Sequence, residues 1–276
     1  NRFEPKTNRL TRFYAEPGQP KRLSHHAIRS IFEDRTGLLW LGTNGGGLNT
    51  LDKKNGEFKQ YGCVPGNPAS LSHNEIRTLY EDHAGNLWVG TRLGGLNRYD
   101  PNTGKFTHFA HASTDSADLS PGSWTTDSTN LSSNKINAIH EDAQGIIWVG
   151  TDAGLDWLDP AAGVVTHIRN NPDDSSSLSG NNIRVIFGDS NGNIWIGTQE
   201  NGLIRYSAKD RSFIRYPIVR SGREWICSPT ITAIAETGDG MLWLGTSNGL
   251  TRLHPDQGTT VCHWQNPQLP DPLSGN

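Results

Sequence analysis

Residues 191–203, NGNIWIGTQENGL, place a tryptophan two residues before Gly-Thr, with a polar turn ahead of it and another glycine behind it. The same arrangement occurs four more times along the 276-residue chain. The other copies are TGLLWLGTNGGGL (36–48), AGNLWVGTRLGGL (84–96), QGIIWVGTDAGL (144–155) and DGMLWLGTSNGL (239–250). The five tryptophans are 48, 60, 47 and 48 residues apart, and a period of this size with β patterning indicates propeller blades or another repeat array.

Each copy contains the pattern of four short strands. The first is an alternating apolar run such as IRSIFED (28–34), which predicts a strand with one buried face. It ends in an Asp-x-x-Gly turn, where the Asp34 carboxylate can bond turn amides and Gly37 permits a positive φ. The Trp-containing core is the second strand, and stretches such as GGLNTLD (46–52) and EFKQY (57–61) are the third and fourth.

A four-stranded sheet of this composition has two apolar faces, so it must pack against its neighbours around an axis. We therefore predict an all-β fold, a β-propeller with four-stranded antiparallel blades, comprising five full blades plus an N-terminal half-blade in one segment over residues 1–276. The predicted pieces are a half-blade at 1–16, blades at about 23–61, 71–109, 131–168, 178–216 and 229–264, and a C-terminal linker at 265–276.

The two ends of the sequence match internal parts of the repeat. NRFEPKTNRLTRFY (1–14) aligns with NRYDPNTGKFTHF (97–109), so we expect the chain to open on the third strand of a blade. DPLSGN (271–276) matches SSLSGN (176–181), the linker before a first strand. We expect the segment to be a fragment of a seven-bladed ring or of a double propeller, with further blades as its partners.

The repeated motif, from the alternating first strand through Glu-Asp, Trp-x-Gly-Thr and Gly-Gly-Leu to the fourth strand, resembles the two-component regulator propeller repeat over nearly all of the chain. That repeat builds extracytoplasmic sensor regions of bacterial hybrid histidine kinases and of some diguanylate cyclases. The resemblance implies a periplasmic location, as the extracytoplasmic part of an inner-membrane protein. It also implies kinase or cyclase domains as signalling partners, and oligosaccharides as a ligand class.

Composition argues against two kinds of partner. The formal net charge is −3, and the sequence has no block of Lys and Arg residues. Such a chain lacks the electrostatic footprint of a nucleic-acid-binding protein. No apolar run approaches the roughly 20 residues that a membrane-spanning helix needs. We therefore expect no nucleic-acid partner, and we expect that this segment does not enter the membrane.

Motifs that resemble catalytic or metal sites fit the repeat better. GTSNG (245–249) matches a nucleophile elbow, but the elbow requires a strand followed by a helix, and here strand follows strand. DSNGNIWIGTQE (189–200) begins like a calcium loop and ends on a glutamate, but it has Ile194 at the sixth position, where such a loop requires glycine. The Glu-Asp pairs recur in three of the five blades, each time beside a turn. We predict no catalytic residue, no metal site and no cofactor.

Positions that the repeat does not dictate are the candidate ligand site. The long interval contains a polar insertion, HASTDSADLSPGSWTTDST (111–129), predicted to be a loop beside the funnel mouth. Trp124 in this loop and Trp225 in another blade have no repeat role, and each either stacks on a sugar or caps a neighbouring loop. The variable turn positions on the same funnel edge are Asn44, Arg92, Asp152, Glu200 and Asn248.

The three cysteines, Cys63, Cys227 and Cys262, match no metal spacing. Cys227 precedes a first strand and Cys262 lies on a fourth strand, three strand spacings or roughly 14 Å away. A disulfide needs Cα atoms within about 7 Å. We therefore expect free thiols.

These observations predict a ligand-sensing propeller that binds a small molecule or oligosaccharide on its funnel face, with a homodimer left open. Two alternatives remain. Streptogramin lyase also resembles a propeller of Trp- and Gly-containing repeats, and that alternative needs a histidine and an acid from different blades converging near the axis. The other alternative is a scaffold for protein–protein interaction.

Overall fold

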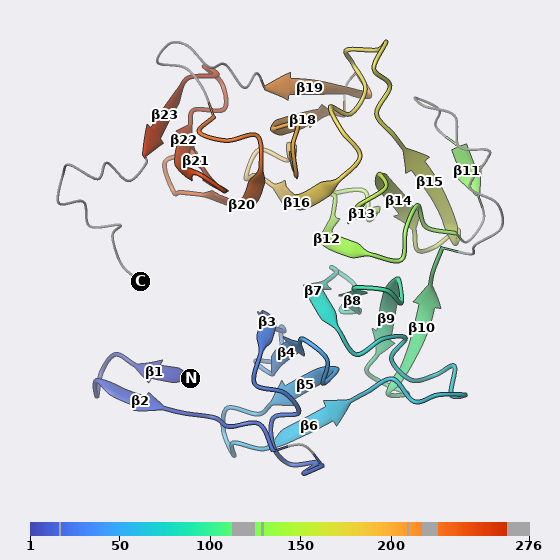
Figure 1. Cartoon of the computed structure of the whole chain (residues 1–276), viewed down its shortest axis with the longest axis vertical. Coiled ribbons are helices and arrows are strands. Elements are labelled where there is room, and N and C mark those ends of the chain that lie inside the picture. Colours follow the sequence, from blue (N-terminus) through green and yellow to red (C-terminus); the bar gives the residue numbers. More distant parts are fainter. Residues whose placement is uncertain (17, 112–124, 128–129, 209, 217–225, 264–276) are drawn as a thin grey trace. The chain divides into compact units, whose positions relative to one another are not determined.

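The computed structural model describes all residues except 17, 112–124, 128–129, 209, 217–225 and 264–276, and of residues 125–127 it describes the backbone only. The described residues form strands and no helix. Besides an N-terminal hairpin, the described strands form five sheets, in each of which four antiparallel strands follow the chain order (Figure 1). The all-β fold with five four-stranded propeller blades is therefore confirmed. Contacts divide the chain into two compact units, which are described separately.

The first unit contains residues 1–110 and 134–136. It begins with a hairpin, at the predicted half-blade, formed by β1 (Arg2–Glu4) and β2 (Arg9–Thr11). The first blade consists of β3 (Ile28–Glu33), β4 (Leu39–Thr43), β5 (Leu48–Leu51) and β6 (Phe58–Tyr61). The second blade consists of β7 (Ile76–Glu81), β8 (Leu87–Thr91), β9 (Leu96–Asp100) and β10 (Lys105–Phe109).

The second unit contains residues 111–133 and 137–276. The third blade consists of β12 (Ile136–Glu141), β13 (Ile147–Thr151), β14 (Leu155–Asp159) and β15 (Val164–Ile168). The fourth blade consists of β16 (Ile183–Gly188), β17 (Ile194–Thr198), β18 (Leu203–Ser207) and β19 (Ser212–Tyr216). The fifth blade consists of β20 (Ile231–Glu236), β21 (Leu242–Thr246), β22 (Gly249–Leu253) and β23 (Thr260–His263).

The insertion at residues 111–129 corrects one prediction. It was expected to be loop throughout, but it contains β11 (Thr125–Asp127). This short strand pairs antiparallel with β15 and gives the third blade a fifth strand. The fourth strand of a blade leaves a row of backbone N–H and C=O groups at the sheet edge, and threonines favour extended structure, so the insertion covers this edge.

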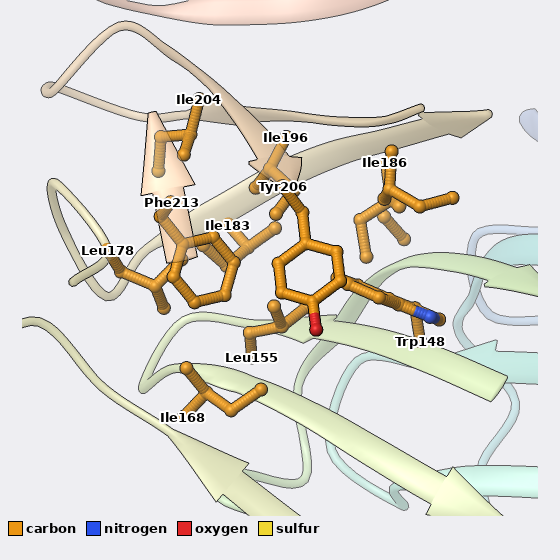
Figure 2. Close-up of a cluster of buried hydrophobic side chains, with 12 residues drawn as sticks. Trp148, Leu155, Ile168, Leu178, Ile183, Ile186, Ile196, Ile204, Tyr206 and Phe213 are labelled. Atoms are coloured by element: carbon orange, nitrogen blue, oxygen red, sulfur yellow. The ribbon is translucent and has the colours of Figure 1, made fainter. Parts of the chain in front are cut away.

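Within each unit, the repeated tryptophan is buried between one blade and the next. In the first unit Trp40 of β4 packs with Leu87 and Val89 of β8, and it is 4% exposed. In the second unit Trp195 of β17 is fully buried against the fifth blade. Figure 2 shows the same layer between the third and fourth blades, where Trp148 of β13 lies close to Tyr206 of β18. The sequence periodicity therefore reports blade stacking.

The glycine of the Trp-x-Gly motif permits the close approach of the next blade. A Cβ atom at Gly197 would lie 2.7 Å from Cβ of Ile231 on the following first strand. A Cβ atom at Gly42 would lie 2.6 Å from Cγ2 of Ile76. Both separations are shorter than van der Waals contact, so a larger side chain would force the blades apart.

The Asp-x-x-Gly turns have a second role besides making the hairpin. Asp82 accepts a hydrogen bond from the backbone amide of Asn86 at 2.7 Å, as the turn pattern predicts. Its other carboxylate oxygen accepts from Nε1 of Trp88 at 2.8 Å. Asp34, Asp142 and Asp189 accept the indole N–H of their own blades in the same way. The turn aspartate therefore fixes the orientation of the tryptophan that the blades bury.

Candidate functional site

The turns between second and third strands lie against the linkers that precede first strands. Asn44 N donates to the Ala27 carbonyl at 2.9 Å, and Arg92 N donates to the Glu75 carbonyl at 3.0 Å. The fourth and fifth blades repeat the bond, from Gln199 N to Asn182 O and from Ser247 N to Thr230 O. We call this edge of the blades, made by these turns and linkers, the rim.

Asn44 and Arg92 come together around a residue that the sequence analysis did not select. The backbone of Asn44 pairs with that of Glu75, and Nη1 of Arg92 lies 2.9 Å from Oε2 of Glu75. The Arg92 hydrogen bond holds the pKa of Glu75 below its ordinary value, so the carboxylate stays ionised. No repeat pattern marks Glu75, because the linker positions vary between blades. The result is an exposed arginine paired with a carboxylate, next to the backbone of Asn44.

The other predicted residues lie on separate blades of the second unit. Asp152 is partly exposed and accepts a hydrogen bond from Ser133 Oγ at 2.7 Å. Glu200 and Asn248 are exposed, and the Asn248 amide donates to Thr246 Oγ1 at 3.1 Å. Trp124 and Trp225 lie outside the described residues.

In the first two blades a repeated contact fixes the linker to the third strand. The amide of Ser24 donates to Oδ1 of Asn49 at 2.9 Å, and Nδ2 of Asn49 donates to Ser24 Oγ at 2.7 Å. Ser72 and Asn97 form the same pair in the second blade. Both asparagines are fully buried, so their amide groups are satisfied by the linker. We call this contact the linker latch, and it holds the rim in one conformation.

In the third blade the latch contains a serine, an aspartate and a histidine. Ser132 Oγ donates to Oδ1 of Asp156 at 2.5 Å, and Nδ1 of His167 lies 2.7 Å from the same oxygen. All three side chains are buried, with at most 4% exposed. A catalytic triad needs the serine hydroxyl to face a histidine nitrogen that can accept its proton, with substrate access. Ser132 Oγ also lies 3.2 Å from Nδ1 of His167, but that nitrogen is engaged by Asp156 and all three side chains are buried away from substrate, so the cluster serves the latch.

In the fifth blade a disulfide corrects the expectation of free thiols. Cys227 and Cys262 are bonded, with their Cα atoms 5.6 Å apart. The estimate from strand spacing assumed that Cys227 lies near the first strand. The linker instead crosses the sheet, where Cys227 N donates to Thr251 Oγ1 at 3.0 Å, and Thr251 pairs with Cys262 in the sheet. The disulfide thus takes the place of the linker latch, while Cys63 is free.

Among the residues that the structure describes, no group of three or more His, Cys, Asp and Glu side chains is placed to hold a metal ion. The described rim residues, such as Arg92, Glu75 and Asp152, carry hydrogen-bonding and charged groups. Such groups can bind and orient a polar ligand.

The repeat is matched by the family model described as two component regulator propeller. It matches five segments, at residues 22–45, 70–92, 130–153, 177–200 and 220–248. Each segment covers a linker, a first strand, the Trp-Gly-Thr strand and the start of the rim turn. The chain belongs to the two component regulator propeller family.

Solved structures similar to this propeller include two from B. thetaiotaomicron. An extracellular domain assigned to the hybrid two component system BT3049 is 26% identical, with a TM-score of 0.69 over 87% of this chain and 30% of that one. The extracellular domain assigned to the hybrid system BT4673 is 24% identical, with a TM-score of 0.66 over 87% of this chain and 31% of that one. The propeller thus spans about a third of the length of these domains.

A lyase shares the fold. Virginiamycin B lyase from Staphylococcus aureus is 14% identical, with a TM-score of 0.59 over 89% of this chain and 71% of that one. At this identity the likeness concerns the blade architecture alone. No curated protein matches the sequence.

Proposed function

We propose that this two component regulator propeller is the ligand-recognising part of a bacterial sensor, outside the cytoplasm, and that it binds an oligosaccharide at the rim. The likeness to an extracellular domain of a hybrid two component system supports the sensor role. The disulfide between Cys227 and Cys262 supports an oxidising compartment, such as the periplasm. None of the described residues belongs to a helix able to span a bilayer.

The observation that carries this proposal is the cluster of Asn44, Glu75 and Arg92. Its groups offer planar donors and acceptors at the surface, and linker latches on both blades hold the backbone that presents them. A preorganised set of this kind recognises sugar hydroxyls at low entropic cost. Asp152, Glu200 and Asn248 stay proposed ligand contacts on the rim turns of the second unit. We propose no catalytic role for the chain.

Arg92→Ala tests the rim. Oligosaccharides from a glycan screen are titrated calorimetrically into the chain. Removing the guanidinium should lower affinity about tenfold, the effect of losing one charge-assisted hydrogen bond. Arg35→Ala is the matched control, because Arg35 forms a comparable ion pair with Glu81 at a turn between first and second strands. If Arg92→Ala and Arg35→Ala bound the oligosaccharide with equal affinity, the rim would be excluded as the ligand site.

Trp124 and Trp225 stay proposed ligand contacts. Trp124→Ala and Trp225→Ala are measured in the same titrations, and each residue is removed from the site if its variant binds like the unaltered chain. The signalling domains, the further blades and a homodimer stay proposed partners. Reading the chromosomal sequence on both sides for a membrane span and a kinase or cyclase core tests the first of these.

A further inference from the structure

A second recessed surface lies at the opposite ends of the strands from the rim, between the third and fourth blades. It is a groove of about 810 Å³ beside the turn that joins β12 to β13 and the turn that joins β18 to β19. We call it the aromatic groove, and its main lining side chains are Gln144, Trp148, Trp157, Thr166, Tyr206 and Arg211.

Three aromatic rings form its floor. The ring centroids of Trp148 and Trp157 are 4.8 Å apart, and both lie close to Tyr206, at 5.0 and 5.3 Å. Trp148 and Tyr206 are buried, and Figure 2 shows Tyr206 reaching from β18 toward Trp148. Trp157 is only partly buried. The fixed pair beneath it therefore holds the Trp157 ring in place at the edge of the groove.

Comparison between blades shows that the scaffold does not require Trp157. It pairs with Trp148 in the sheet, and the residue in the same register is arginine in three other blades and Thr50 in the first. The arginines Arg98, Arg205 and Arg252 each lie about 6 Å over the tryptophan of their own blade. The repeat thus covers its tryptophan with a guanidinium, and the third blade replaces that cation with a flat apolar ring.

Polar side chains border this ring. Gln144 and Arg211 are exposed, and Thr166 is partly exposed. The groove does not offer a free carboxylate at Asp142, because that group accepts bonds from Trp148 Nε1 and from the amides of Gln144 and Ile146. A flat apolar surface bordered by the uncharged Gln144 and Thr166 and by the Arg211 guanidinium fits a ligand with one apolar face and hydroxyl groups at its edge.

We infer that the aromatic groove is a second carbohydrate site, which stacks the apolar face of a neutral pyranose on Trp157 and bonds its hydroxyls through Gln144, Thr166 and Arg211. The site is independent of the rim, because the two surfaces lie at opposite ends of the blade strands.

Trp157→Arg is the decisive variant, because it installs the residue that three sister blades carry. Cellohexaose, mannohexaose, xylohexaose and maltohexaose are titrated into the full chain, with calorimetry and tryptophan fluorescence as readouts. The unaltered chain should bind at least one of them, and Trp157→Arg should lower that affinity about tenfold. Arg205→Lys, at the equivalent position of the fourth blade, should leave it unchanged.

A double variant, Gln144→Ala with Thr166→Ala, keeps the test independent of folding, because Gln144 is exposed and Thr166 partly so. It should weaken binding of the same hexasaccharide while the thermal unfolding midpoint stays constant. If Arg92→Ala weakens binding and Trp157→Arg does not, the ligand binds at the rim alone. That result would overturn the proposal of a carbohydrate site in the aromatic groove. Failure of all four hexasaccharides to bind would overturn it too.

Discussion

At the scale of single residues, four of the five blades depend on one aspartate that serves both turn and core. The carboxylate of Asp82 is 3% exposed and accepts from a turn amide and from the buried indole of Trp88. The Asp-x-x-Gly pattern predicted the turn, and Gly37 and Gly85 adopt the expected positive φ of 83° and 86°. The indole bond could not be predicted from that pattern, because it joins residues six apart across a hairpin.

Asp82→Ala should destabilise the fold by about 3 kcal/mol, since it leaves buried donors without an acceptor. The fifth blade provides the control, because Thr237 stands at the aspartate position. Thr237→Ala should cost less than about 1 kcal/mol, because the hydroxyl it removes is exposed. Urea unfolding followed by fluorescence measures both. If Asp82→Ala and Thr237→Ala lowered the free energy of unfolding equally, the proposed role of the aspartate would be wrong.

Asp34 predicts a dependence of stability on pH. Burial alone would raise its pKa, but hydrogen bonds from Thr36, Trp40 and Leu38 outweigh burial and lower the pKa below 3.8. Because the pKa is lower in the folded than in the unfolded chain, Asp34 stabilises the fold above about pH 4, and this contribution is lost as the pH falls through the folded pKa. Unfolding midpoints of Asp34→Asn should therefore change less between about pH 4 and pH 2 than those of the unaltered chain. If the unfolding midpoints of Asp34→Asn and of the unaltered chain changed equally over this pH range, the prediction would be wrong.

At the scale of elements, the linker latch explains how the rim is held. In four of the five blades the linker is fixed at one place, by serine with asparagine in the first two, by serine with aspartate and histidine in the third, and by a disulfide in the fifth. The strand periodicity predicted the strands well, because alternation reports burial directly. It could not predict the path of a linker over a sheet. For this reason the disulfide of Cys227 was not expected, and Glu75 was not selected as a site residue.

Reduction of the disulfide should lower stability by about 3–4 kcal/mol, because it frees a loop of 35 residues in the unfolded chain. Urea midpoints are compared with and without a reductant. Cys63→Ser is the control, and it should change neither midpoint. If the reductant has no effect on the unaltered chain, the latch role of the disulfide is wrong.

At the scale of the whole molecule, stacking of blades decides which positions are free to vary. Gly197→Ala brings a methyl group against Ile231 of the next blade and should destabilise the fold by about 1–3 kcal/mol. At Gly245 of the fifth blade the nearest side-chain contact for a new Cβ is Ala233 of the same blade, at 3.3 Å. Gly245→Ala should therefore be milder, as judged by thermal unfolding. A larger effect at Gly245 would contradict blade stacking through this motif.

The blades were predictable from the sequence because five copies repeat one packing solution. The candidate site was predictable only as positions that break the repeat, such as Asn44 and Arg92. Its companion Glu75 depends on where a linker meets a neighbouring turn, and the aromatic groove depends on a turn and strand from two different blades. Neither juxtaposition leaves a periodic signal in the sequence.

The central claim is that a rigid repeated frame recognises its ligand through the residues that the repeat leaves free. Amide hydrogen exchange, measured on the full chain with and without the oligosaccharide whose affinity Arg92→Ala lowers, tests it most directly. We predict slower exchange in the rim turns at residues 44–47, 92–95 and 152–154, with unchanged exchange in the Trp-Gly-Thr strands. Protection spread over those strands, or none in the rim turns, would contradict the account.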